Sequence, residues 1–250
     1  MVSKVESAVR QIRRLIQINS QEEGRLPSEP DLARMLDASR ATIRLALSEL
    51  ESNGLIVRKH GSGTFINQQV LGIRTRLEEV WDFQEMIRLA GYTPGVRHHQ
   101  QSLAPASQKV ASALALEPGR EVLTTANVFL ANDMPVIYCV DVIPAHLVRH
   151  AYREAELQGP VYTFLAERCG QRIDHNITEI LPVVANGPLA EFLECEPGSA
   201  LHYFEEIGFN ADHEPILYSE EYYRPEFFSF KVIRKMTTRG QGEADGHPET

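Results

Sequence analysis

Apolar residues recur at helical spacing through the N-terminal part of the chain, and polar residues separate the apolar runs. The pattern predicts a first helix over residues 4–19. Ser28 opens a capping-box sequence and predicts a second helix over 29–36. Ser39 is placed to cap a third helix over about 40–53. Three short helices are therefore expected at the start of the chain.

The spacing changes from helical to alternating after the third predicted helix. The stretch LIVRKHGSGTFI, residues 55–66, is typical of two short strands joined by a glycine-rich turn. Two helices, a tight turn, a third helix and a hairpin follow one another in the order of a winged helix-turn-helix. We therefore expect a DNA-binding domain over residues 1–67, followed by a polar linker over residues 68–76.

The second part of the chain contains an internal duplication. Residues 113–123, ALALEPGREVL, match residues 192–202, FLECEPGSALH. Residues 131–138, ANDMPVIY, match residues 211–218, ADHEPILY, at nearly the same offset. Each copy has the pattern of a short helix, a Pro-Gly turn and two strands. Two such copies predict a pseudo-symmetric domain whose hairpins join one antiparallel sheet.

The boundaries of the second domain follow from the same pattern. It is expected to span residues 77–236 and to begin with a helix over about 77–90. The tail, residues 237–250, has too few apolar residues to form a core and is expected to be disordered. The predicted fold class is α+β, with a winged helix-turn-helix followed by an antiparallel sheet domain with helices. The linker and the helix after it are expected to be the only connection between the two domains.

Charge is distributed unevenly between the two predicted domains. The whole chain carries a formal net charge of −9. Residues 1–70 contain 10 Lys and Arg against 8 Asp and Glu, which leaves +2, and the remainder contains 15 against 26, which leaves −11. This asymmetry is typical of a protein in which one part meets an anion and the other part has a different task.

The cysteines and the apolar content indicate where in the cell the protein is expected. Cys139, Cys169 and Cys195 are an odd number of cysteines without CxxC spacing, so a reduced, cytoplasmic location is expected. No stretch is long and apolar enough to cross a bilayer, and no membrane partner is expected. No phosphate loop, nucleophile elbow or paired-carboxylate motif is present, and neither a cofactor nor a metal is expected.

The third predicted helix carries arginines beside its apolar face. In SRATIRLALSEL, residues 39–50, Arg40 and Arg44 lie one turn apart, roughly 6 Å along the axis. An arginine there can donate to O6 and N7 of guanine in the major groove. Ser39 and Thr42 can donate to phosphates, and the basic hairpin tip can reach the backbone or the minor groove. The predicted DNA contacts are Ser39, Arg40, Thr42, Arg44, Lys59, His60 and Gly61.

Residues 26–66 resemble a known family over a long and specific stretch. The sequence LPSEPDLARMLDASRATIRLALSELESNGLIVRKHGSGTFI is similar to the DNA-binding domain of the GntR family of bacterial transcription regulators. The resemblance implies base and phosphate contacts at Ser39, Arg40, Thr42 and Arg44, and wing contacts at His60 and Gly61. Two positions depart from the family pattern. Pro30 stands where an arginine is common, so one customary DNA contact is missing, and Asp37-Ala38 replaces the usual Gly-Val.

The remainder of the chain is similar to the UTRA effector-binding domain of the HutC branch, with GPVYTFLAERCG and YYRPEFFSF as landmarks. That domain shares its fold with chorismate lyase, so the resemblance implies a chorismate-lyase-like sheet and a small-molecule effector. In the branch members that bind sugar phosphates, basic residues stand where this chain has Ala126–Phe129. A Ser-Leu-Tyr stands where it has Pro160–Tyr162, and a glutamate usual in the next strand falls at Cys139.

The predicted pocket therefore lacks the cations that hold a phosphate. The effector is expected to be neutral, more apolar or carboxylate-bearing, and a phosphorylated sugar is not expected to be the inducer. The candidate lining residues are Asn127, Phe129, Tyr138, Tyr162, Arg172, His175, Glu220, Tyr223 and Arg224.

The predicted function is that of a ligand-responsive transcription regulator, expected to be a repressor, that binds palindromic double-stranded operator DNA as a homodimer. Two alternatives stay open. One is a chorismate-lyase-like enzyme fused to a DNA-binding module, which needs a reactive group with an orienting partner. The other is a metal-responsive regulator, because His146 and His150 have the i, i+4 spacing of a helical zinc pair. RHHQ, residues 97–100, is interpreted as a strand with one histidine facing out.

Overall fold

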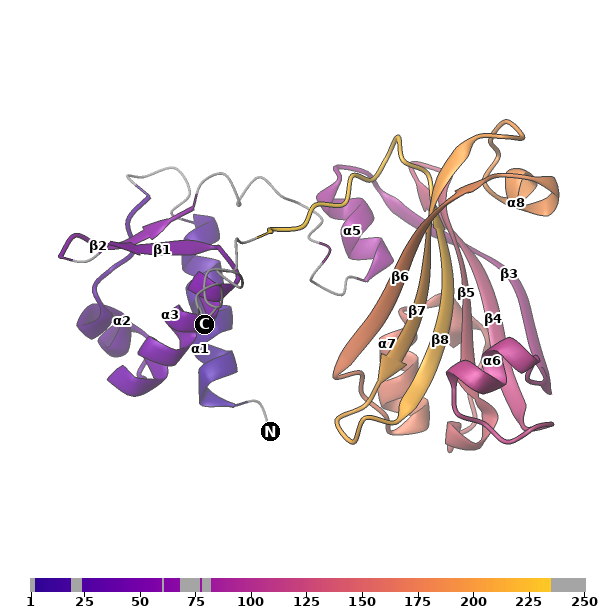
Figure 1. Ribbon diagram of the computed structural model, residues 1–250, viewed down its shortest axis with the longest axis horizontal. Helices are drawn as coiled ribbons and strands as arrows, with labels where there is room; N and C mark the ends of the chain where they lie inside the picture. Colours follow the sequence, from indigo (N-terminus) through magenta and orange to yellow (C-terminus); the bar gives the residue numbers. More distant parts are fainter. Residues whose placement is uncertain (1–2, 19–23, 60, 68–76, 78–81, 235–250) are drawn as a thin grey trace, which may run out of the picture. The chain divides into compact units, whose positions relative to one another are not determined.

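The chain folds into two compact units, which Figure 1 shows as ribbons. The computed structural model describes residues 3–18, 24–59, 61–67, 77 and 82–234. The predicted linker, the predicted tail and His60 lie outside the described residues.

The division into units differs from the sequence-based boundaries at the C-terminal side. One unit contains residues 1–76 and 231–250, and the other contains residues 77–230. The segment that begins at Lys231 therefore groups with the N-terminal unit, whereas the pattern extended the second domain to residue 236. The chain passes between the units at two places, so the expectation that the linker is the only connection is wrong.

Three helices and a hairpin form the N-terminal unit, in the predicted order. They are α1 (Lys4–Ile18), α2 (Glu29–Met35), α3 (Arg40–Ser52), β1 (Ile56–Lys59) and β2 (Gly63–Ile66). Ser28 caps α2 by accepting the N–H of Asp31, and Ser39 caps α3 by accepting the N–H of Thr42 at 3.1 Å. These bonds pair backbone donors that the first turn of a helix leaves free, which fixes where α2 and α3 begin.

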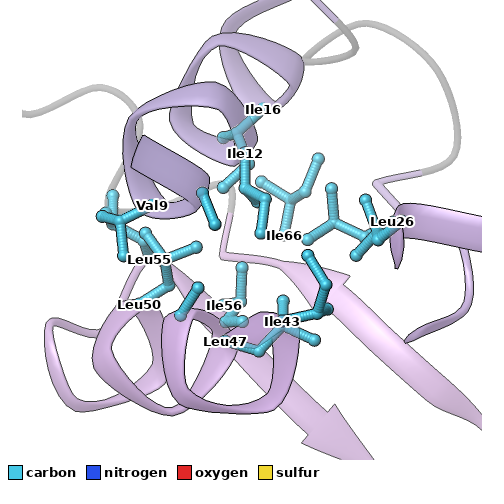
Figure 2. Packing of buried hydrophobic residues seen from close by; sticks show 13 residues of the cluster. Val9, Ile12, Ile16, Leu26, Ile43, Leu47, Leu50, Leu55, Ile56 and Ile66 are labelled. Atoms are coloured by element: carbon cyan, nitrogen blue, oxygen red, sulfur yellow. The ribbon is translucent and has the colours of Figure 1, made fainter. Parts of the chain in front are cut away.

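An apolar core joins α1, α3 and the hairpin (Figure 2). Figure 2 shows Ile12 and Ile16 of α1 on one side and Ile43 and Leu47 of α3 on the other. Each fully buried side chain of this size contributes about 1.5–3 kcal/mol to folding. Ile233, from the segment that returns from the second unit, also packs against this core.

One antiparallel sheet of six strands forms the second unit. Its strands are β3 (Pro94–Pro105), β4 (Glu121–Ala131), β5 (Met134–Pro144), β6 (His175–Val184), β7 (Ala200–Phe209) and β8 (Pro215–Tyr223). Their order across the sheet is β3-β4-β5-β8-β7-β6. The second half of this order mirrors the first about the β5–β8 pair. Hairpins β4–β5 and β7–β8 are the duplicated sequences, and the predicted single sheet is confirmed.

Short helices cover both faces of the sheet (Figure 1). α6 (Gln108–Ala113) and α8 (Gly187–Phe192) pack on one face, here named the α6 face. α5 (Phe83–Leu89) and α7 (Val161–Phe164) lie on the opposite face, here named the α7 face. The 3-10 turns η1 (Ala145–Leu147) and η2 (Glu154–Gln158) precede α7, which continues into a π-helical turn, η3 (Leu165–Cys169).

Helix α5 begins later than the predicted helix over 77–90. Asp82 lies outside the helix in extended conformation and caps it by accepting the N–H of Glu85 at 2.9 Å. A residue that caps a helix has non-helical backbone angles, so the helix begins at Phe83.

Candidate functional site

Helix α3 carries unpaired basic side chains on its solvent side. Arg40 and Arg44 are exposed, and neither forms an ion pair with any residue in the described part of the chain. Leu45 stands beside them with 59% of its surface exposed. The opposite side of the helix is buried in the core of the unit. The basic side of α3 is therefore open to an anionic partner.

The first turn of α3 adds hydrogen-bonding groups to this surface. Ser39 Oγ lies 2.8 Å from Thr42 Oγ1 and accepts the Thr42 N–H. Both residues stand at the helix N-terminus, where the helix dipole and free N–H groups favour an anion. The cap fixes the Ser39 side chain at the exposed first turn of α3.

The β1–β2 hairpin holds two more cations over one aromatic ring. Lys59 Nζ lies 5.1 Å from the centroid of the Phe65 ring, and Arg25 Cζ lies 5.9 Å from it. Gly61 and Gly63 at the turn have φ of +74° and +108°, a backbone region that favours glycine. At Gly63 a Cβ atom would also lie only 3.0 Å from Arg25 Nε, so glycine there leaves room for the arginine.

A shallow cleft joins this hairpin to the start of α2. Arg25, Arg58 and Lys59 line it together with Ser28, Gly61 and Gly63. Arg58 also pairs with Glu51 of α3 at 3.4 Å and donates to the Arg44 carbonyl at 3.2 Å. This bridge ties the base of the hairpin to α3, so both basic surfaces belong to one rigid unit.

A row of polar side chains crosses the α7 face of the sheet. Its members are consecutive register partners from β4 to β6, namely Thr125, Asp141, Ser219, Glu206 and Thr178. Directly opposed residues of antiparallel strands share a face, so their side chains lie next to one another. Asp141 and Glu206 are 5% and 8% exposed, and Glu221 on the same face is 5% exposed. Three carboxylates are thus buried on one face of the sheet.

The hydrogen-bond partners of these carboxylates are neutral groups. Ser219 Oγ donates to Asp141 Oδ1 at 2.6 Å, and the Tyr223 hydroxyl donates to Glu221. Glu206 accepts from three donors, which are Thr178 Oγ1 at 2.7 Å, Tyr162 Oη at 3.4 Å and the Asn176 side-chain amide. Neutral hydrogen bonds stabilise a buried carboxylate less than a cation does.

Burial makes the charged form of all three groups unfavourable. It raises the pKa of Asp141 to about 6, against the hydrogen bond from Ser219 that lowers it. Burial also raises the pKa of Glu206, and the charge of Asp141 adds to the shift. Burial and the charge of Glu206 hold the pKa of Glu221 well above its usual range. Shifts of this kind are enriched at functional sites.

A small cavity of about 10 Å³, which has room for one water-sized group, lies between this polar face and α7. Its lining residues are Asp82, Phe83, Phe129, Asp141, Gly159, Pro160, Val161, Tyr162 and Glu221. Phe83 and Phe129 meet edge to face with their ring centroids 4.7 Å apart. The lining of the cavity therefore combines aromatic rings with carboxylates.

Comparison with known proteins identifies both units. The model of the bacterial regulatory proteins of the gntR family matches residues 4–66, and the UTRA domain model matches residues 89–229. The chain belongs to the GntR family and carries a UTRA domain. It is a ligand-responsive, DNA-binding transcription regulator.

Relatives of this GntR-family chain extend over most of its length. The HTH-type transcriptional regulator Rv0792c of Mycobacterium tuberculosis is 28% identical over 227 residues, which cover 88% of this chain and 81% of the relative. The HTH-type transcriptional repressor NagR of Bacillus subtilis is 26% identical over 205 residues, which cover 82% and 83%. The structure of the possible transcriptional regulator YydK from Bacillus subtilis has a TM-score of 0.76 at 20% identity and covers 94% of this chain and 100% of its own, which supports the fold.

The UTRA sheet separates the predicted pocket residues into two groups. Asn127, Phe129 and Tyr223 lie on the α7 face, and Tyr162 reaches the same region from α7. Phe129 and Tyr162 line the cavity. The Asn127 amide donates to the Leu157 carbonyl at 2.9 Å, which supports the loop before α7.

The other predicted pocket residues lie away from the cavity. Tyr138 is on the α6 face, where it stacks on Phe192 with centroids 4.8 Å apart. Glu220 is on the same face and accepts from Lys109 at 3.0 Å. His175 stacks on Phe209, Arg224 lies over Phe227, and Arg172 is exposed before β6. The structure does not bring these side chains to the cavity.

Four residues on the α7 face were not among the candidates. They are Thr125, Asp141, Glu206 and Glu221. A signal for two of them is present in the sequence, because Asp141 and Glu221 hold equivalent positions in the duplicated hairpins, 80 residues apart. The carboxylate missing at Cys139 is supplied two residues later in β5, by Asp141 on the same face. In the N-terminal unit, Arg25 in the cleft and the exposed Leu45 on α3 were not among the candidates either.

The histidines of this GntR-family chain do not have the helical arrangement of a zinc pair. The turn η1 ends at Leu147 and Val148 is extended, so His146 and His150 do not share a helix face, and both are exposed. No group of three or more metal-ligating side chains occurs in the described part of the chain. The strand predicted for RHHQ is confirmed in β3, with His99 exposed and His98 contacting Asn127. Among the described helices, none is long and apolar enough to span a membrane.

Proposed function

We propose that this regulator is an operator-binding repressor of the HutC branch. In this proposal α3 reads bases with Arg40 and Arg44, and the first turn and the hairpin hold phosphates. The observation that carries it is the unpaired, exposed arginine pair on a capped helix whose other side is locked in the core. Phosphate contacts position such a helix and base contacts give it specificity.

The DNA half of the proposal is tested by arginine replacement. We expect Arg40→Ala and Arg44→Ala each to lower specific operator affinity by about 1–3 kcal/mol per lost base contact. Lys59→Ala should weaken binding to all sequences alike and reduce the slope of log K against log salt by about one. Fluorescence anisotropy with operator and scrambled duplexes at two salt concentrations measures both effects.

A matched control separates base reading from loss of charge. Arg10 is exposed on α1, outside the proposed reading surface, and Arg10→Ala removes the same charge. We expect it to preserve the ratio of specific to non-specific affinity. If the α3 arginine variants kept that ratio as well, α3 would not be the reading helix.

We propose that the effector binds at the cavity between the sheet and α7, with one of its polar groups inside the cavity among Phe129, Asp141, Tyr162 and Glu221. A ligand can shift DNA binding only if it binds the DNA-competent and incompetent states with different affinity. The two crossings of the chain between the units are the covalent routes for that coupling.

We propose binding rather than catalysis at this cavity. A cysteine nucleophile must be a thiolate, and burial raises the pKa of the Cys139 thiol well above its usual range. Cys139 lies among the carboxylates, whose charges raise the pKa further. A chorismate-lyase-like enzyme would need a polarising or reactive group here, and the partners of the carboxylates are structural hydroxyls and an amide.

We propose that the regulator acts as a homodimer on a palindromic operator. Helix α3 has 13 residues, and only its first turns carry exposed basic groups, so one copy contacts few base pairs. Symmetric regulators double their contacts by placing two reading helices in successive major grooves. The sheet of the UTRA domain supplies apolar edge surface for such an interface.

A further inference from the structure

The acidic face of the effector cavity has no cation of its own. The Asp141, Glu206 and Glu221 carboxylates accept hydrogen bonds from hydroxyls and one amide, and none contacts a Lys, Arg or His among the described residues. Buried charges in proteins are normally paired, because an unpaired one costs several kcal/mol. A cluster of three therefore favours a positively charged partner from outside the chain.

The rest of the cavity lining has the matching chemistry. Phe83, Phe129 and Tyr162 line the cavity with aromatic rings. The face of an aromatic ring is electronegative and attracts ammonium and guanidinium groups. Aromatic rings and carboxylates around one small space are both suited to an organic cation. A carboxylate or phosphate ligand would instead meet like charge.

An independent observation on Thr125 also indicates a ligand. Thr125 lies directly beside Asp141 in the sheet, on the same face, and only 3% of it is exposed. Its hydroxyl oxygen has no hydrogen-bond partner in the described part of the chain. Buried hydroxyls are almost always paired, and an unpaired one costs about 1–3 kcal/mol. A donor group of a ligand bound beside Asp141 would pair it.

We propose that the effector carries a positively charged amine. Its ammonium group, which is about the size of a water molecule, binds Asp141 and Glu221 in the cavity, and the rest of the effector extends out of the cavity past Phe129 and Tyr162. This inference rests on the proposed role of the cavity as the effector site. Glu206 contributes its charge from the neighbouring strand. The aromatic rings in the lining favour an organic cation.

The experiment compares amines with their neutral counterparts on the full-length protein. The probes are small primary amines, each paired with the alcohol that has a hydroxyl in place of the amino group, such as glucosamine with glucose and 1,4-diaminobutane with 1,4-butanediol. Anionic probes without an amino group, glucose-6-phosphate and succinate, complete the panel. Thermal shift at neutral pH identifies binders, and calorimetry measures their affinities. We expect binders among the amines, with each alcohol at least about tenfold weaker.

Charge-removing variants locate the bound amine. Glu221→Gln keeps the shape of the side chain and should weaken amine binding about tenfold or more. Glu206→Gln, which should have a smaller effect in the same direction, serves if the first variant folds poorly. Glu179 is exposed on β6 and points to the α6 face, away from the polar row, so Glu179→Gln removes the same charge and should leave amine affinity unchanged.

The outcomes separate this inference from the proposed function. A neutral or anionic compound that binds more tightly than the amines, releases the operator and is weakened by Tyr162→Phe would overturn the cationic effector and preserve the effector site. Amine binding that Glu221→Gln leaves intact would overturn the inference as well. If none of the amines bound at concentrations up to about 10 mM, the cationic effector would also be overturned. If no compound of any charge altered operator binding, the proposed function itself would fail.

Discussion

Asp141 shows how one buried residue sets a pH response in the effector unit. Burial raises the pKa of its carboxyl from 3.8 to about 6, so the folded chain holds this proton more tightly than the unfolded chain does. The stabilising effect of the proton is fully present below about pH 4 and is lost as the pH rises toward 6. Glu206 and Glu221 have pKa shifts in the same direction, so the cluster weakens the fold near neutral pH.

Replacing Asp141 by asparagine should remove this pH dependence. Over the two-unit shift, the lost stability is about 3 kcal/mol at about 1.4 kcal/mol per pH unit. We therefore expect the free energy of unfolding of Asp141→Asn, relative to the natural chain, to rise by up to that amount between pH 4 and pH 7. Urea unfolding at the two pH values, monitored by far-UV circular dichroism, measures this difference in the free energy of unfolding.

An exposed aspartate provides the control for this measurement. Asp212 lies exposed in the β7–β8 turn, and Asp212→Asn should change the free energy of unfolding equally at both pH values. If the difference in the free energy of unfolding between Asp141→Asn and the natural chain were also the same at both pH values, the prediction would be wrong, because the Asp141 carboxylate would then cost the fold nothing when it is charged.

The surroundings of a residue can be predicted from the sequence when its neighbours in the fold are also its neighbours in the chain. Arg40 and Arg44 face solvent because the helical period alone places them off the apolar side of α3. Asp141 gives no such signal, since β5 is buried on both faces and lacks alternation of polar and apolar positions. Its neighbours Ser219 and Glu206 come from strands 65 or more residues away, which only the strand order brings together.

At the scale of elements, α3 combines two tasks in its first turn. Ser39 pairs the Thr42 N–H, which stabilises the helix, and its hydroxyl is also exposed toward the proposed DNA surface. Serine and aspartate are comparable N-caps, but aspartate adds a negative charge. Substitution at this one position can therefore separate stability from DNA binding.

Two substitutions at Ser39 should have different effects. We expect Ser39→Ala to lower the free energy of unfolding by about 1 kcal/mol, because it removes the cap. Ser39→Asp should keep the stability close to that of the natural chain and weaken operator and non-specific DNA binding alike, because its carboxylate repels phosphate. Denaturant unfolding and anisotropy titrations on the same preparations measure the two properties.

Ser48 provides the comparison, because it is exposed on the same helix and has no capping role. Ser48→Ala should leave stability within about 0.5 kcal/mol. If Ser39→Asp bound DNA as tightly as the natural chain does, the first turn of α3 would lie outside the DNA interface.

Most elements were predictable because their signals are local. Caps, glycine turns and hydrophobic period determine α2, α3 and the β1–β2 hairpin within a few residues. Helix α5 was predicted too long, since apolar spacing continues upstream of Asp82 and does not reveal the cap. The duplication predicted two hairpins in one sheet, but which strand of each hairpin lies at the centre depends on packing between the copies.

At the scale of the whole molecule, the strand order places the effector site near a symmetry element. β5 and β8 are equivalent strands of the two copies and pair at the centre of the sheet. Asp141 and Cys139 of one copy face Ser219 and Glu221 of the other, and these are equivalent positions exchanged across the pair. The polar site is thus a product of the duplication, assembled from both halves of the UTRA domain.

The same order leaves β3 and β6 as the two edges of the sheet, and one of them fits the proposed homodimer interface. Ile177 and Leu181 on one side of β6 are 61% and 41% exposed, and Ile180 and Val184 on its other side are 41% and 56% exposed. An edge strand with this much apolar surface favours association with a second strand. Edge β3 exposes a single large apolar side chain among its described residues, Leu103 at 61%.

We therefore expect the β6 edge to hold the dimer together. Ile177→Glu combined with Leu181→Glu should convert a dimer at micromolar concentration into a monomer, because the added carboxylates would be buried in the interface without partners. Leu103→Glu is the matched change on the opposite edge and should leave the dimer intact. Size-exclusion chromatography with light scattering measures the mass, and operator binding should weaken steeply only in the monomeric variant, since a palindrome needs two linked reading helices. A natural chain that is monomeric without DNA would contradict the homodimer, and dissociation by Leu103→Glu alone would move the interface to β3.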